Sequence, residues 1–195
     1  MDPIMRVRGF TLIELLIALT IFGFLIMLAG PQLATFLASS QVRNAAEAIL
    51  NGVQRTQTTA INANTQARFV LDPTTGTGGW QILETIDGAE PAPGPLSVNP
   101  VQVFALADGA PSAAVTPKPA GATQITFDGF GRIIANVDTS ATLRCVDVAH
   151  STNSSARALR VIFSNTVENS GTKICDPDPN LNPGDPQVCP PVACS

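Results

Sequence analysis

The chain has 195 residues, of which 45% are hydrophobic and 13% are charged, and its formal net charge is −4 at pH 7. This composition is too apolar for a disordered chain, and its negative balance means that contact with nucleic acid would need a local basic patch. Once an apolar N-terminal segment is set aside, the length that remains is enough for one ordinary domain.

An apolar segment, residues 10–29, follows a short stretch that carries Arg6 and Arg8, and its single charge is Glu14. As a helix it would span roughly 30 Å, which is the thickness of the hydrocarbon core of a bilayer. Basic residues mark the cytoplasmic side, so we expect a cytoplasmic N-terminus and an exported domain. A secretory signal peptide fits poorly because its apolar region is shorter and ends at a small-residue cleavage site. A simple signal anchor is the better alternative.

Glu14 is the most informative residue of this segment, because a carboxylate inside an apolar span is costly and indicates a functional partner. With the basic leader before it, the pattern GFTLIE at residues 9–14 resembles the prepilin signal of type IV pilins and type II secretion pseudopilins. The resemblance implies cleavage after Gly9 by a membrane prepilin peptidase and methylation of the new Phe10 amine. Glu14 would pair with that amine on a neighbouring subunit and set the assembly register. Pro31 would kink the helix.

Beyond Pro31 the sequence stays compatible with a helix to about Ala63, with apolar residues every three or four positions. This stripe is expected to pack on the sheet of the domain rather than to bind a cofactor. Short apolar runs between turn residues then predict strands. These are residues 66–71, 80–86, 101–106, 124–127, 132–137, 142–148 and 159–163. Residues 88–121 are rich in Pro, Ala and Gly and are expected to form an irregular surface excursion.

Several pieces of the domain, in their order along the chain, resemble the H-type minor pilins and pseudopilins of the GspH/FimT family. They are residues 60–62, 79–80, 125–131, 159–163 and 174–177. The resemblance implies an α+β fold, in which a long N-terminal transmembrane and amphipathic helix packs on an antiparallel β-sandwich-like head. The expected parts are a cleaved leader (1–9), a transmembrane helix (10–30), an amphipathic helix (31–64), a β-rich periplasmic head (65–177) and a Pro-rich tail (178–195).

Four cysteines in the last third of the chain fit disulfide bonds if the domain lies in an oxidising compartment. They are Cys145, Cys175, Cys189 and Cys194. The sequence cannot choose among the three possible pairings, although a Cys189–Cys194 bridge would close the tail and Cys145 with Cys175 would join two strands. Free buried thiols are the alternative. A zinc site is disfavoured, because the spacing is not CxxC and His150, the single histidine, is far from any cysteine pair.

The preferred function is that of a minor pilin or pseudopilin that helps to initiate or tip a type IV filament, in a type IV pilus or a type II secretion system. Its partners would be other pilin or pseudopilin subunits, the prepilin peptidase, the inner-membrane assembly platform and membrane lipid, with no cofactor. We expect a single pass of the bacterial inner membrane, with a cytoplasmic N-terminus and a periplasmic head, and later a place in the filament.

Two alternatives are a binding module, namely a minor pilin that captures DNA, and, within the structural class, the abundant major pilin. DNA capture would need several cations that displace phosphate counterions. The candidates are Arg144, Arg157, Arg160 and Lys173. DNA is possible but not favoured, because Lys173 stands where many family members have an Arg-rich stretch and the tail is acidic. An enzyme is disfavoured, since the polar run beside His150 lacks a nucleophile motif. We therefore predict no catalytic residue.

Overall fold

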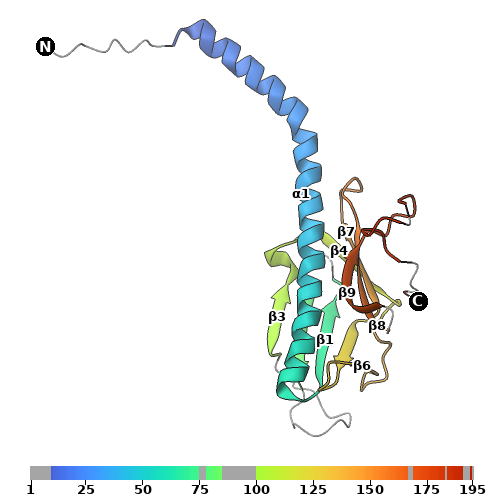
Figure 1. The fold of residues 1–195 in the computed structure, drawn as a ribbon. Coiled ribbons are helices and arrows are strands. Elements are labelled where there is room, and N and C mark those ends of the chain that lie inside the picture. Colours follow the sequence, from blue (N-terminus) through green and yellow to red (C-terminus); the bar gives the residue numbers. More distant parts are fainter. Residues whose placement is uncertain are drawn as a thin grey trace, which may run out of the picture. The chain divides into compact units, whose positions relative to one another are not determined.

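The computed structural model of the chain describes residues 10–74, 78–84, 100–166, 169–182, 184–190 and 194. It begins with one long helix, α1 (Leu12–Ala63), which precedes all the described strands (Figure 1). The chain forms two compact units, Met1–Leu37 and Ala38–Ser195. The second unit, which we call the head, contains the C-terminal part of α1 and the strands.

The described strands of the head form two antiparallel sheets. The β1 sheet has the order β3-β2-β1-β5-β6, and the β7 sheet has the order β4-β7-β8-β9. The strands are β1 (Ala67–Asp72), β2 (Gly79–Glu84), β3 (Gln102–Ala105), β4 (Ala113–Lys118), β5 (Gln124–Phe127), β6 (Ile133–Ile134), β7 (Cys145–His150), β8 (Leu159–Thr166) and β9 (Asn169–Cys175). A short 3₁₀ helix, η1 (Leu106–Asp108), follows β3.

The apolar stripe of α1 packs against both sheets within the head. Val42, Ile49 and Val53 are at most 1% exposed, and they share one core cluster with Phe69 of β1 and Val161 of β8. Burial of such side chains contributes about 1.5–3 kcal/mol each. This arrangement confirms the α+β fold class, with a helix packed on antiparallel sheets.

Gly52 allows α1 to approach the β1 sheet closely. A Cβ at this position would lie 2.7 Å from the ring of Trp80 and 2.8 Å from that of Phe69. The two rings pack against each other, with centroids 5.9 Å apart. Glycine is unfavourable inside a helix, but at this position it leaves the space that the two aromatic rings fill.

The expectation of an irregular excursion over residues 88–121 is wrong for Ala113–Lys118, which form β4. Ala113 and Val115 face the core, but Pro117 interrupts the sequence pattern of a strand. Proline is tolerated here because β4 lies at the edge of its sheet and needs hydrogen bonds on one side only. The apolar runs also omitted β9, although the pairing considered for Cys145 and Cys175 placed Cys175 in a strand. Residues 88–99 of the expected excursion lie outside the described residues.

Length and composition identify no single described helix as a membrane span. The two pieces Leu12–Leu28 and Gln32–Ala63 meet these criteria when they are taken together as a bent pair. The kink at Pro31 therefore stays a prediction, as do the boundaries of the transmembrane and amphipathic parts.

Candidate functional site

The N-terminal unit exposes apolar side chains around the whole helix. Every large apolar residue from Phe10 to Leu28 is at least 50% exposed within the chain. Glu14 is the only charged residue between positions 10 and 37. A helix that is apolar on all sides must be buried in lipid or against other helices. The site thus consists of an apolar surface that no other described part of the chain covers, with one carboxylate within it.

The predicted assembly residues lie at the start of α1. The Glu14 N–H donates a hydrogen bond to Thr11 Oγ1 at 3.3 Å, which caps the helix. Phe10 precedes the helix and is 85% exposed. The carboxylate of Glu14 occupies the first turn, where the helix dipole favours negative charge. Gly9 and the leader 1–9 lie outside the described residues, so cleavage, methylation and register stay predictions.

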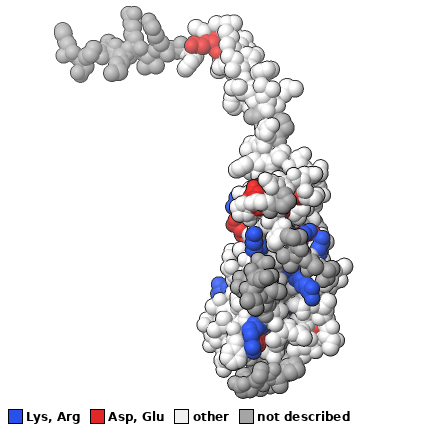
Figure 2. All heavy atoms as spheres, turned by 45° about the vertical axis from the view of Figure 1, so that its right-hand side comes forward, with Lys and Arg blue, Asp and Glu red and all other residues white. Residues whose placement is uncertain are grey.

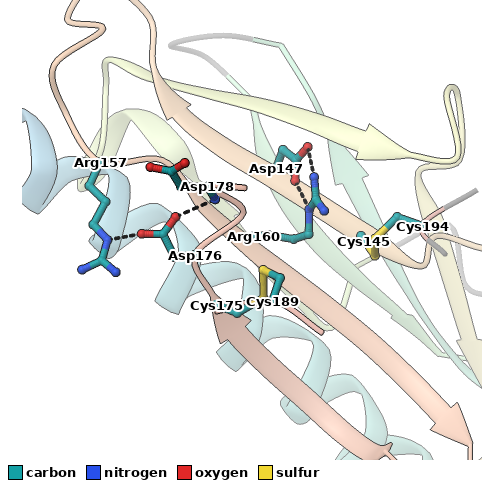
Figure 3. The surroundings of a disulfide bond; sticks show 9 residues. All are labelled: Cys145, Asp147, Arg157, Arg160, Cys175, Asp176, Asp178, Cys189 and Cys194. Carbon is teal, nitrogen blue, oxygen red and sulfur yellow. Dashed lines mark hydrogen bonds and ion pairs between the residues drawn. A yellow bond between two sulfur atoms is a disulfide. The ribbon is translucent and has the colours of Figure 1, made fainter. Parts of the chain in front are cut away.

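All four cysteines form disulfide bonds, which are Cys145–Cys194 and Cys175–Cys189 (Figure 3). The suggested pairing of Cys145 with Cys175 and of Cys189 with Cys194 is therefore wrong. Strand β8 lies between β7, which carries Cys145, and β9, which carries Cys175. Two strands apart, the Cα atoms are separated by at least about 9 Å, beyond the roughly 7 Å limit of a disulfide.

The two disulfides hold the tail on the face of the β7 sheet that points away from the α1 core. Ile162 is 5% exposed and packs with the four cysteines in a cluster of its own. The Asp176 N–H donates to the Gln187 carbonyl at 2.7 Å, and the Cys189 N–H donates to the Asp176 carbonyl at 2.9 Å. The tail thus folds back along the end of β9.

Two of the four basic residues that were candidates for DNA contact form ion pairs with carboxylates (Figure 3). Arg160 donates to both carboxylate oxygens of Asp147, at 2.5 and 2.9 Å, and Lys118 approaches the same carboxylate at 3.0 Å. Arg157 forms an ion pair with Asp176, which is 5% exposed.

The two other candidates, Arg144 and Lys173, are exposed. On the face that Figure 2 shows, the Lys and Arg atoms form separate groups. Two of the four candidates, Arg157 and Arg160, are paired with carboxylates in this structure.

Asp147 is paired with two basic side chains, those of Arg160 and Lys118. Burial raises the pKa of Asp147, but hydrogen bonds from Arg160 and Lys118 and the charges of both side chains outweigh burial, so that this pKa lies below its ordinary value. Salt bridges of this kind, which are partly shielded from water, stabilise more than fully exposed pairs.

We expect Asp147 to make the stability of the head sensitive to acid. A carboxylate whose pKa is lowered on folding stabilises the fold above its unfolded pKa, and the contribution is lost as the pH falls through the folded pKa. The ordinary value is 3.8, so the loss occurs below that pH. Thermal unfolding at neutral and acid pH should show that Asp147→Asn is less stable by about 1–2 kcal/mol at pH 7 and changes less with pH.

The matched control for this prediction is Asp108→Asn, which removes the same charge from an exposed position in η1. It should unfold like the unmodified chain at neutral pH. An Asp147→Asn variant with the pH profile of the unmodified chain would show that this ion pair does not contribute to the acid response.

Comparisons with known proteins support the family that the sequence motifs indicated. The family model described as type II transport protein GspH matches residues 45–166, which is more than half of the chain. The prokaryotic N-terminal methylation motif matches residues 4–30. The crystal structure of the type IV minor pilin FimU of Pseudomonas aeruginosa (strain PAO1) is 17% identical, with a TM-score of 0.42, and the match covers 62% of this chain and 81% of that chain. No curated protein matches.

The two family matches agree with the order of the parts along the chain. The methylation motif indicates a protein that is processed by a prepilin peptidase, is anchored in a membrane and then joins other pilins in a filament. The match over the head places the chain in a family of structural filament subunits. The chain therefore belongs to the GspH family and is a minor pilin or pseudopilin of a type IV filament system.

Proposed function

We propose that this chain enters its filament through the apolar helix at residues 10–37 and helps to initiate the filament or to form its tip. The observation that supports this proposal most directly is the apolar surface around Glu14, which nothing in the chain covers among the described residues. Lipid would cover this surface before assembly, and the helices of neighbouring subunits would cover it afterwards.

The carboxylate of Glu14 would give this packing its register. A charge that loses water inside a helix bundle is stabilised only when an opposite charge and hydrogen bonds compensate it. Cleavage after Gly9 creates an amine on Phe10 at the same end of the helix. A neighbouring subunit in the wrong axial position would leave both the amine and the carboxylate unpaired, so the pair selects one register.

The topology that we propose follows from charge and redox chemistry. Arg6 and Arg8 would keep the leader 1–9 in the cytoplasm, residues 10–30 would span the inner membrane, and the head would lie in the periplasm. The bonds Cys145–Cys194 and Cys175–Cys189 support this placement of the head and of the tail, because disulfides form and persist in oxidising compartments.

The mature chain is expected to begin at an N-methylated Phe10 and to contain 186 residues (195 − 9). Mass spectrometry of the chain from membranes measures both features at once. The control is the same chain from cells without the prepilin peptidase, which should retain Met1. A mature chain that still begins at Met1 in cells with the peptidase would contradict the proposal.

An initiating or tip subunit would be present in few copies per filament. Quantitative mass spectrometry of sheared filaments, with the major subunit as internal reference, measures the ratio. An abundance equal to that of the main filament component would instead assign the chain to the filament body, as a major pilin.

The unmodified chain is expected not to bind DNA strongly. Asp147 and Asp176 compensate Arg160 and Arg157, and a phosphate backbone would have to compete with these carboxylates. A mobility-shift titration of the full chain in detergent at low ionic strength should show no salt-dependent complex. Salt-dependent binding that weakens in Lys173→Ala would restore DNA capture as the function.

A further inference from the structure

The loop between β7 and β8 contains a polar run, STNSS at residues 151–155, which has neither a charged nor an apolar side chain. Four of its residues are exposed, and Asn153 is half-buried. Asn153, Ser154 and Ser155 form the pattern Asn-x-Ser/Thr, which marks an acceptor of N-linked glycans in exported proteins. No other asparagine in the sequence has Ser or Thr two positions later.

Hydrogen bonds hold the backbone of this loop in a defined conformation. The Ser151 N–H donates to the Ser112 carbonyl at 2.8 Å, which ties the loop to the residue before β4. The N–H groups of Thr152 and Asn153 both donate to His150 Nδ1, at 3.3 and 3.1 Å. Nδ1 can accept these bonds because the neutral imidazole carries its proton on Nε2. The backbone of Asn153 is therefore fixed by the histidine at the end of β7.

The side chain of Asn153 is oriented by an Asx turn. Its Oδ1 accepts a hydrogen bond from the Ser155 N–H at 3.0 Å. Its Nδ2 donates no hydrogen bond to any residue that the structure describes. By contrast, Nδ2 of Asn136, which is 4% exposed, donates to the Ser140 carbonyl at 3.1 Å. The amide nitrogen of Asn153 is thus held in place by its oxygen and is available to react.

The hydroxyl that completes the acceptor pattern is accessible on the same loop. Ser155 is exposed, and its N–H, rather than its hydroxyl, donates in the Asx turn. An enzyme that recognises the pattern can therefore reach the Asn153 amide and the Ser155 hydroxyl together. The sequence pattern and the loop conformation are separate observations, and both indicate a modification site.

We propose that Asn153 is the acceptor of an N-linked glycan, which is transferred from a lipid-linked saccharide diphosphate on the outer side of the membrane. Nδ2 forms a bond to the anomeric carbon of the first sugar, and the bond from that carbon to a diphosphate oxygen breaks. The diphosphate leaves with the electron pair, Nδ2 loses one proton, and nothing is oxidised or reduced. This inference rests on the proposed function, because the donor and the head meet only if the head is exported.

The composition of the loop suits such an attachment. A glycan is bulky and hydrophilic, so it must lie in solvent rather than in a core or in a contact between subunits. Residues 151–155 offer no apolar side chain that such a contact would bury. The glycan would therefore keep this loop of the head on the solvent side of the filament.

Mass spectrometry of peptides from the full chain, isolated from its own cells, tests the proposal. We expect a saccharide on the peptide that contains Asn153, with fragment ions that assign it to this residue. Asn153→Gln and Ser155→Ala should each lower the modified fraction at least about tenfold, because each removes one required residue of the acceptor pattern.

Ser154→Ala and Ser155→Thr are the matched controls. Ser154→Ala removes a neighbouring hydroxyl that the pattern does not require, and Ser155→Thr keeps the required one, so both chains should retain the saccharide. The bonds Cys145–Cys194 and Cys175–Cys189, assayed in the same samples, report that the head of each variant has folded and has been exported.

Three results would overturn the proposal. They are an unmodified Asn153 in chains that carry both disulfides, a saccharide on a hydroxyl of the loop instead of on Asn153, and a saccharide that persists on Asn153 in Ser155→Ala. Each of them leaves the proposed function intact, since the chain has been exported. A chain that retains Met1 and free thiols would instead contradict the proposed function, and with it the export that this inference requires.

Discussion

Glu14→Ala is expected to leave cleavage and methylation at Phe10 intact and to lower incorporation into filaments at least about tenfold. In the proposed function, cleavage acts on the leader, whereas Glu14 would act when neighbouring helices pack. Truncation of one partner of a charge pair that has lost its water costs about 3–5 kcal/mol, because the other charge stays unpaired. Immunoblots of sheared filaments and of membranes, each with mass spectrometry of the N-terminus, measure assembly and processing separately.

Two further variants make this test specific for the charge. Glu14→Gln keeps the shape and the hydrogen-bonding oxygen but removes the charge, and it should fail in assembly almost as strongly as Glu14→Ala. Glu47→Ala removes a carboxylate from an exposed pair with Arg43 on the same helix and should assemble normally. Normal incorporation of Glu14→Gln would show that polarity, rather than charge, is what Glu14 contributes.

The long helix could be predicted from the sequence because its signals are local. The spacing of apolar residues predicted a helix to about Ala63, where α1 ends. Burial along this stripe begins only near Ala38, however, and Leu33, Phe36 and Leu37 are exposed. The periodicity identifies an apolar face, but it cannot say whether that face packs inside the chain or against another molecule.

Pairing across the sheets could not be predicted, because it depends on contacts between distant residues. A bond between Cys145 and Cys175 would have joined two strands, but the strand order places β8 between β7 and β9, which carry these cysteines. Strand β4 was missed because proline weakens the pattern at Pro117, where an edge position tolerates it. Asp147 showed no partner in the sequence because Arg160 and Lys118 reach it from the neighbouring strands β8 and β4.

The motif at residues 125–131 contains a turn in which the carboxylate of Asp128 binds backbone N–H groups. Asp128 is 4% exposed and its carboxylate accepts hydrogen bonds from the Phe130 N–H at 3.0 Å and the Arg132 N–H at 2.8 Å, and from Arg132 Nε at 2.9 Å. Gly131 in the same turn has a φ of +75°, which favours glycine. The resemblance identified this turn, and the hydrogen bonds explain why an acidic residue begins it.

Removal of the Cys145–Cys194 bond is expected to lower the free energy of unfolding more than removal of the Cys175–Cys189 bond. In the chain-entropy model, a disulfide stabilises by restricting the unfolded chain, and longer loops gain more. The two bonds close sequence separations of 49 and 14 residues. The model gives about 4 kcal/mol for the longer loop and about 3 kcal/mol for the shorter one.

The paired variants Cys145→Ala/Cys194→Ala and Cys175→Ala/Cys189→Ala test this order by urea unfolding of the full chain in detergent. Alanine suits the strand positions because Cys145 and Cys175 are at most 2% exposed, and a hydroxyl would lack a partner there. The unmodified chain under reducing conditions is the control and should be less stable than either variant.

The reverse order would identify a different source of stability. Cys175–Cys189 holds the tail next to the Asp176 hydrogen bonds and over Ile162, which is 5% exposed. If removal of this shorter bond lowers the free energy of unfolding more, the bond stabilises the head mainly by packing the tail on the β7 sheet. Restriction of the unfolded chain would then be the smaller contribution. Faster proteolysis of the tail in Cys175→Ala/Cys189→Ala than in Cys145→Ala/Cys194→Ala would then locate the loss at the end of β9.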